Sequence, residues 1–232
     1  SAHCGTRHAD RASQNLIRAK LQELSAEQVA NTVTHGFGLT LSLAGFLALL
    51  VVAGLGGNPL VIAGAAIYGT SLVTLYAAST VYHSSTSPLK KKLQVLDHCC
   101  IYLLIAGSYT PFAIVLADRW IGPGLLAAVW SLAVAGIVAK IFIGARFQFI
   151  SVIAYLAMGW LGVFAIEPLL QTIGYVPITL IVAGGIAYSL GVIFFAWTRL
   201  RHHHAVFHVF VLAGSILHYA AIVLYVVPRG TV

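Results

Sequence analysis

The stretch LVIAGAAIYGTSLVTLYAASTVYH, residues 60–83, contains no Asp, Glu, Lys or Arg. It is longer than the roughly 20 apolar residues that an α-helix needs to cross the hydrocarbon core of a bilayer. Its apolar residues run continuously, whereas the strands of a membrane β-barrel alternate between apolar and polar positions. The stretch therefore predicts a transmembrane helix that ends in a histidine, His83.

Similar apolar stretches recur along the whole chain. Hydrophobic residues make up 59% of the 232 residues and charged residues 8%, and the mean hydropathy is +0.93. Such a composition excludes an ordinary soluble domain. We expect an all-α integral membrane protein with seven transmembrane helices, at residues 34–55, 60–82, 95–116, 121–142, 149–170, 176–197 and 205–227.

The positive charges are unevenly distributed between the two sides of the predicted bundle. All but two of the 13 Lys and Arg residues lie before the first span or in the loops after the second, fourth and sixth spans, and the exceptions are Arg119 and Arg229. Because short cytoplasmic loops carry the positive excess, we expect a cytoplasmic N-terminus and an external C-terminus. The net charge of +7 therefore reflects the positive residues of the predicted cytoplasmic loops, and no nucleic-acid partner is expected.

The chain divides into a polar N-terminal segment, residues 1–30, and a seven-helix transmembrane domain, residues 31–232. Residues 12–30 mix leucines with charged and amide side chains, which predicts an amphipathic helix at the inner membrane surface. Cys99 and Cys100 are interpreted as reduced, buried packing residues, with metal binding or acylation as the alternative.

Five polar residues gather at one end of three predicted spans: Ser79, His83, Asp97, His204 and His208. Serine and histidine in the second span, and the two histidines of the seventh, are each four residues apart, so each pair projects from one helix face. The predicted topology brings all five to the inner end, at one depth. Ionisable side chains inside a membrane are costly and usually mark a functional site.

Three histidines with a nearby carboxylate predict a zinc site. His83, His204 and His208 would be the metal ligands, since three protein ligands are typical of catalytic zinc. Asp97 would orient a water molecule or act as general base, and Ser79 would hydrogen-bond that water or an oxyanion. Two alternatives stay open: Asp97 as a ligand with one histidine outside the ligand set, and histidines that are merely interfacial.

Further polar residues have smaller expected roles. Glu27, Asn31 and His35 follow each other at helical spacing towards the first span, so they could brace the site, with Asn31 and His35 as supporting residues. His218 lies about 21 Å beyond His204 along an ideal helix, too far for the same metal. We expect it to make an interhelical hydrogen bond, and we expect a structural or interfacial role for His98.

The motifs together resemble one known family. These are NTVTH at 31–35, STVYH at 79–83, Leu96 with Asp97, and HAVFHVFVLAGSILH at 204–218. Their combination resembles the hemolysin III branch of the progestin and AdipoQ receptor family. The resemblance implies a seven-helix bundle and zinc on the three histidines, with an aspartate holding a water. It also implies kinship with alkaline ceramidases, and thus hydrolysis of a lipid amide.

Three functions are compatible with these features. The first is a zinc-dependent hydrolase of membrane lipid amides or esters that takes part in lipid homeostasis, with an acyl chain inside the bundle. The second is a receptor-like regulator of membrane state in which zinc is structural. The third, ranked last, is a pore-forming cytolysin, because spans with a strong inside-positive pattern are typical of a resident membrane protein. The expected partners are membrane lipids, and the expected location is the bacterial inner membrane.

Overall fold

A computed structural model describes residues 2–86, 88–144 and 148–229, with side chains from residue 26 onwards. These ranges are helical and contain no strand. A helix covers almost all of each expected span. The elements are α1 (Ala2–Gly56), α2 (Pro59–Ser84), α3 (Lys90–Ile114), α4 (Ile121–Ile143), α5 (Gln148–Trp160), the 3-10 helix η1 (Leu161–Ala165), α6 (Ile166–Ile173), α7 (Tyr175–Ala196), α8 (His203–Ala221) and the π-helix η2 (Ile222–Val226).

Six helical segments in the described part of the chain are long and apolar enough to cross a membrane, with α5, η1 and α6 acting as one of them. This confirms an all-helical, multi-pass architecture. α3 is not among the six, because three lysines open it and Asp97 and His98 follow within two turns. The count of seven spans and the orientation of the termini therefore stay predictions.

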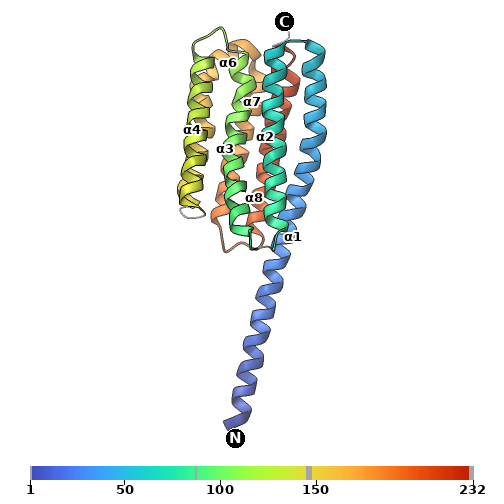
Figure 1. Ribbon diagram of the computed structural model, residues 1–232, viewed down its shortest axis with the longest axis vertical. Coiled ribbons are helices and arrows are strands. Elements are labelled where there is room, and N and C mark those ends of the chain that lie inside the picture. The colour runs from blue at the N-terminus through green and yellow to red at the C-terminus, as the bar shows by residue number, and fades with distance from the viewer. Residues whose placement is uncertain (1, 87, 145–147, 230–232) are drawn as a thin grey trace.

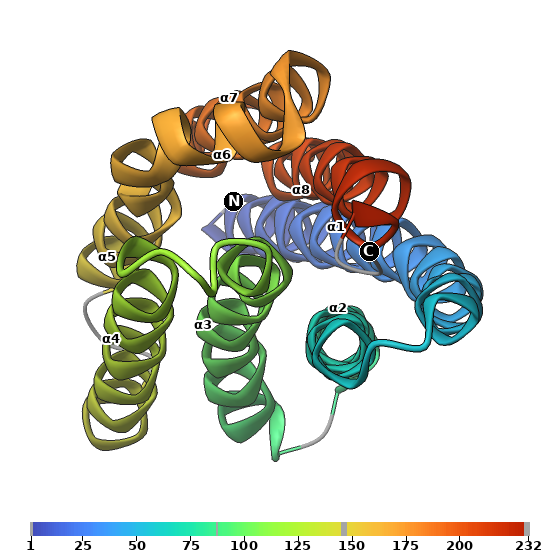
Figure 2. The same ribbon diagram turned by 90° about the horizontal axis from the view of Figure 1, so that it is seen from above.

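The helices stand side by side along the long axis of the molecule (Figure 1). Seen from above, they follow the chain around the bundle from α1 to α5, and α7 and α8 return to α1 (Figure 2). α8 packs on both α7 and α1, and α1 packs on α2. The end of α2 and the start of α8 thereby meet beside α1 at the same end of the bundle.

α1 is one continuous helix from Ala2 to Gly56. Its N-terminal part projects beyond the bundle (Figure 1). The boundary expected near residue 30 is thus not a break in the helix. The amphipathic arrangement of residues 12–30 at a membrane surface stays a prediction, and the side chains of residues 12–25 lie outside the described side chains.

Close contacts at glycines set the distance between neighbouring helices. A Cβ atom on Gly38 of α1 would lie 2.4 Å from the ring of Tyr76 on α2, and one on Gly184 of α7 would lie 2.3 Å from the imidazole of His218 on α8. Small residues allow such close approach of helices in membranes, where packing rather than water exclusion drives association. Gly38 brings α1 against the part of α2 that leads to His83.

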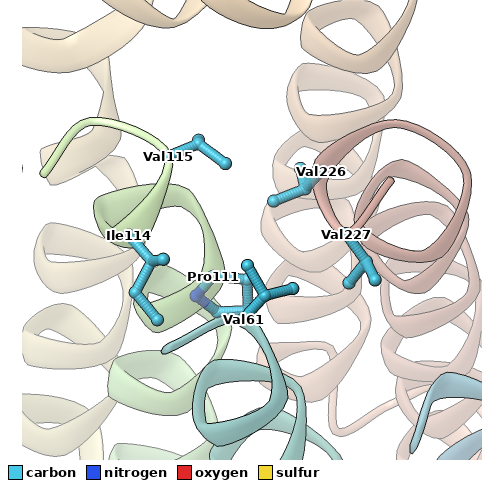
Figure 3. Close-up of a pocket in the computed structure, with 6 residues that line it drawn as sticks. All are labelled: Val61, Pro111, Ile114, Val115, Val226 and Val227. Carbon is cyan, nitrogen blue, oxygen red and sulfur yellow. The ribbon is translucent and has the colours of Figure 1, made fainter. Parts of the chain in front are cut away.

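A small cavity lies between the start of α2, the end of α3 and the π-helix (Figure 3). Its lining is entirely apolar: Val61, Pro111, Ile114, Val115, Val226 and Val227. Val61 precedes His83 by about 33 Å along an ideal helix, from the rise of 1.5 Å per residue. The cavity therefore belongs to the opposite end of the bundle from the histidines.

Candidate metal centre

Three histidines from α2 and α8 converge at the end of the bundle from which the N-terminal part of α1 projects (Figure 1). One nitrogen from each of His83, His204 and His208 lies within 4.8 Å of the others. The ring centroids of His83 and His208 are 4.9 Å apart, and those of His204 and His208 are 4.6 Å apart. His83 comes from the last turn of α2, and the other two occupy successive turns at the start of α8. The helical spacing seen in the sequence thus becomes a three-imidazole cluster.

The donor set fits a divalent transition metal. His83 and His208 are buried, and the Nε2 atom of His83 has no hydrogen-bond partner among the described residues. A buried polar nitrogen without a partner costs free energy, and a metal ion would satisfy it. Imidazole nitrogens suit zinc, copper, iron and nickel. The residues therefore fit the zinc ion that the sequence predicts.

α1 fixes the orientation of His208. The Oγ1 atom of Thr34 lies 3.3 Å from Nδ1 of His208, and this hydroxyl already donates to the carbonyl groups of Ala30 and Asn31. When the single hydroxyl proton of Thr34 points to one of these carbonyl groups, Nδ1 of His208 is the donor in its contact with Thr34, and Nε2 keeps its lone pair free. Such a hydrogen bond to the second ring nitrogen is the usual support for a metal-binding histidine.

His35 is in direct contact with one of the predicted ligands, His208. Its ring stacks on that of His208 with a centroid distance of 3.5 Å and also contacts Tyr76 at 5.1 Å. Both ring nitrogens of His35 are buried without partners in the described structure. Asn31 contributes its backbone carbonyl to His208, while its side-chain oxygen has no partner. Both residues therefore lie beside the cluster, and their supporting role stays a prediction.

Ser79 and Asp97 form a second part of the site. The buried hydroxyl of Ser79 lies close enough to the buried carboxylate of Asp97 to interact with it across the interface between α2 and α3. Ser79 lies one turn before His83, about 6 Å along the helix. Asp97 is not one of the side chains whose ligand atoms meet in the histidine cluster. Its connection to that cluster runs through Ser79.

Glu27, His98, His203 and His218 are not among the side chains whose ligand atoms meet in the cluster. A carboxylate oxygen of Glu27 is 3.8 Å from His203, not from a predicted ligand. Nδ1 of His98 donates to the Gln94 carbonyl, and its Nε2 accepts from the Gln148 amide. His218 donates from Nε2 to the Ile181 carbonyl on α7 at 3.0 Å. The interhelical hydrogen bond of His218 is confirmed, and the hydrogen bond between His98 and Gln148 joins α3 to α5.

Two cysteines agree with expectation, and two residues that contact the cluster were not predicted. Cys99 and Cys100 are free thiols and buried, as expected. Sequence reasoning missed Thr34 and Tyr76, which contact His208 and His35. Neither stands out in the sequence, because a threonine next to a histidine and a tyrosine in an apolar span are common. Their roles arise only from the way α1 packs on α2 and α8.

The fold and the site define a class: a multi-pass helical membrane protein with a buried histidine cluster at one end of its bundle. The chain belongs to the haemolysin-III related family, whose model matches residues 25–219, and this range includes every residue of the site. The family is related to the progestin and AdipoQ receptor family, as the motifs indicated.

Individual relatives support this assignment. Hemolysin-3 of Bacillus cereus is 41% identical over 91% of this chain and 97% of its own length. A hemolysin-3 homolog of Bacillus subtilis is 42% identical over 87% of this chain and 95% of its own length. The human monocyte to macrophage differentiation factor is 31% identical over 67% of each chain.

Proposed function

We propose that this protein is a zinc-dependent hydrolase of membrane lipid amides or esters. The observation that carries the proposal is the convergence of His83, His204 and His208, with ligand atoms within 4.8 Å of one another, one helical turn from the Ser79–Asp97 pair. A hydrolase needs both an electrophilic centre and a base, and these two features supply candidates for each.

The proposed topology has seven spans, a cytoplasmic N-terminus and the site at the inner face of a bacterial plasma membrane. α3 would be the seventh span: it has 25 residues, packs between α2 and α4, and runs alongside them (Figure 1). Seven crossings place the termini on opposite sides, and the uneven distribution of Lys and Arg favours the inner side for the N-terminus. The Bacillus relatives are consistent with a bacterial membrane.

The chain's own residues would divide the work as follows. When bound by the three histidines, zinc would polarise a substrate carbonyl and make a water molecule more acidic. Asp97, held by Ser79, would take the proton from the attacking water and return it to the leaving amine or alcohol. Thr34 and His35 would keep His208 in position, because they contact its ring from α1. The lipid substrate would reach the site from the bilayer.

Metal content and turnover, measured on the same preparation, test the proposal. Protein purified in mild detergent and washed with a weak chelator is expected to hold about one zinc per chain, by elemental mass spectrometry. It should release fatty acid from at least one member of a panel of lipid amides and esters. Removing zinc with a strong chelator should abolish that release, and adding zinc should restore it. Protein without zinc would contradict the proposal.

A structural role for zinc is the second candidate, and one observation favours it. The three histidines join α2 to α8, and Thr34 joins α1 to the same cluster. In this case the protein would regulate or report membrane state. Metal removal would then lower the thermal unfolding temperature, while no lipid of the panel would be hydrolysed before or after it.

Cytolysis is a third candidate, because two of the relatives are called hemolysin-3 or its homolog. We expect purified protein to leave protein-free liposomes sealed, since its apolar helices suit a resident membrane protein. Release of an encapsulated dye measures this, with a known pore-forming peptide as the positive control. Dye release that rises with protein concentration would support cytolysis instead.

A further inference from the structure

A second polar cluster lies at the same end of the bundle, on the far side of α3 from Ser79. Lys140 of α4 is only 3% exposed, and its Nζ donates to Oγ of Ser151 on α5 at 3.2 Å. Cys99 and His98 of α3 are close enough to Lys140 to interact with its charge. The cluster thus joins α3, α4 and α5, and the proposed metal centre uses none of these residues.

The charge of Lys140 has no partner of opposite sign in the described structure. The described ion pairs join His98 to Asp97 and His203 to Glu27, and neither includes this lysine. Asp97 interacts with His98 and Ser79, and no ion pair joins it to Lys140 in the described structure. A buried ammonium group without a counter-charge is strongly unfavourable.

Two ordinary explanations of a lysine near a helix end do not apply. The side chain of Lys140 does not extend away from the bundle, because it is buried and lies on the same inward face of α4 as Val129 and Ala133. The carbonyl groups at the end of α4 offset part of its charge. However, the first turn of α5, which contains Gln148 and Ser151, brings the positive end of another helix to the same place.

The surrounding groups are donors suited to an oxyanion. The ammonium group of Lys140 has three N–H donors, and Ser151 takes one of them. The amide of Gln148 donates one N–H to His98 and has a second available. Backbone N–H groups in the first turn of a helix have no partner within that helix and bind anions.

We infer that Lys140, Ser151 and the first turn of α5 form an anion site that takes one phosphate group. The phosphate could belong to the headgroup of an anionic phospholipid or be free inorganic phosphate, because both offer the same tetrahedral oxygens. The depth of the site, at the inner ends of α4 and α5, is that of the headgroups in the proposed topology. The inference does not depend on zinc or on hydrolase activity.

The test begins with the unmodified protein in neutral detergent. Native mass spectrometry should show one phosphatidylglycerol retained per chain, and the thermal unfolding temperature should rise with this lipid but not with phosphatidylcholine. A rise with inorganic phosphate alone would identify the free ion as the ligand. If neither phosphatidylglycerol nor inorganic phosphate binds or stabilises the protein, the inference is wrong, whatever any variant does.

Variants locate the binding. Lys140→Gln should weaken the binding about tenfold, the effect of losing one charged hydrogen bond, while Lys140→Arg should retain it. Lys91→Gln is the matched control, because Lys91 is exposed near the same end and lies outside the cluster. Ser151→Ala should also weaken the binding, although it keeps the charge of Lys140. This variant tests the site if Lys140→Gln does not fold. The inference would be overturned if a folded Lys140→Gln protein and the Ser151→Ala protein both bound the ligand as tightly as Lys91→Gln and the unmodified protein.

Discussion

Replacing His208 with alanine is expected to remove nearly all zinc from the purified protein. His208 is buried, touches both other predicted ligands, and has its second nitrogen anchored to Thr34. Loss of a residue that merely supports a ligand lowers metal affinity by about 10- to 100-fold. Loss of a ligand itself should exceed that. Elemental mass spectrometry after a mild chelator wash measures the effect.

His203→Ala is the matched control for this experiment. His203 is adjacent to His204 in sequence, yet its described ionic contact is with Glu27 rather than with the cluster. This variant should keep about one zinc per chain. Full zinc content in a folded His208→Ala protein would show that the three histidines are not the ligand set.

Replacing Asp97 with alanine should have the opposite pattern: zinc remains, but lipid hydrolysis falls by about 10²- to 10⁴-fold, the usual contribution of a general base. The physical reason is that Asp97 bonds Ser79 and is not among the side chains whose ligand atoms meet. Metal content and fatty-acid release from one preparation give both values.

Asp118→Ala is a suitable control, because Asp118 lies in the segment between α3 and α4, at the opposite end of the bundle from the histidines. It should retain both zinc and activity. Loss of zinc from Asp97→Ala would instead make Asp97 a ligand, the alternative that the sequence left open. Unchanged hydrolysis in Asp97→Ala would remove this residue from the mechanism.

These two variants also separate the proposed functions. If zinc is structural, His208→Ala lowers the unfolding temperature because α2 and α8 lose their link, and Asp97→Ala has no activity to lose. If zinc is catalytic, the two variants lose hydrolysis for different reasons, one with zinc and one without.

Much of the fold could be predicted from the sequence because the bilayer imposes simple rules. A continuous apolar stretch must satisfy its backbone within itself, so residues 60–83 form a helix wherever they lie in the bundle. Only α3 is less clearly a transmembrane helix, because polar residues, among them Asp97, interrupt its apolar sequence. Spacing of four residues also predicted that His204 and His208 share a face.

The tertiary structure alone decided which helices meet and at what height. The contact of His35 with His208 and the hydrogen bond between Thr34 and His208 join residues far apart in the chain, and Lys140 is buried against Ser151 of the next helix. Inside a membrane the buried and the lipid-facing sides of a helix are both largely apolar, so hydrophobicity does not mark which side meets which neighbour. Close packing at small residues such as Gly38 sets that choice, and it depends on the shapes of both helices at once.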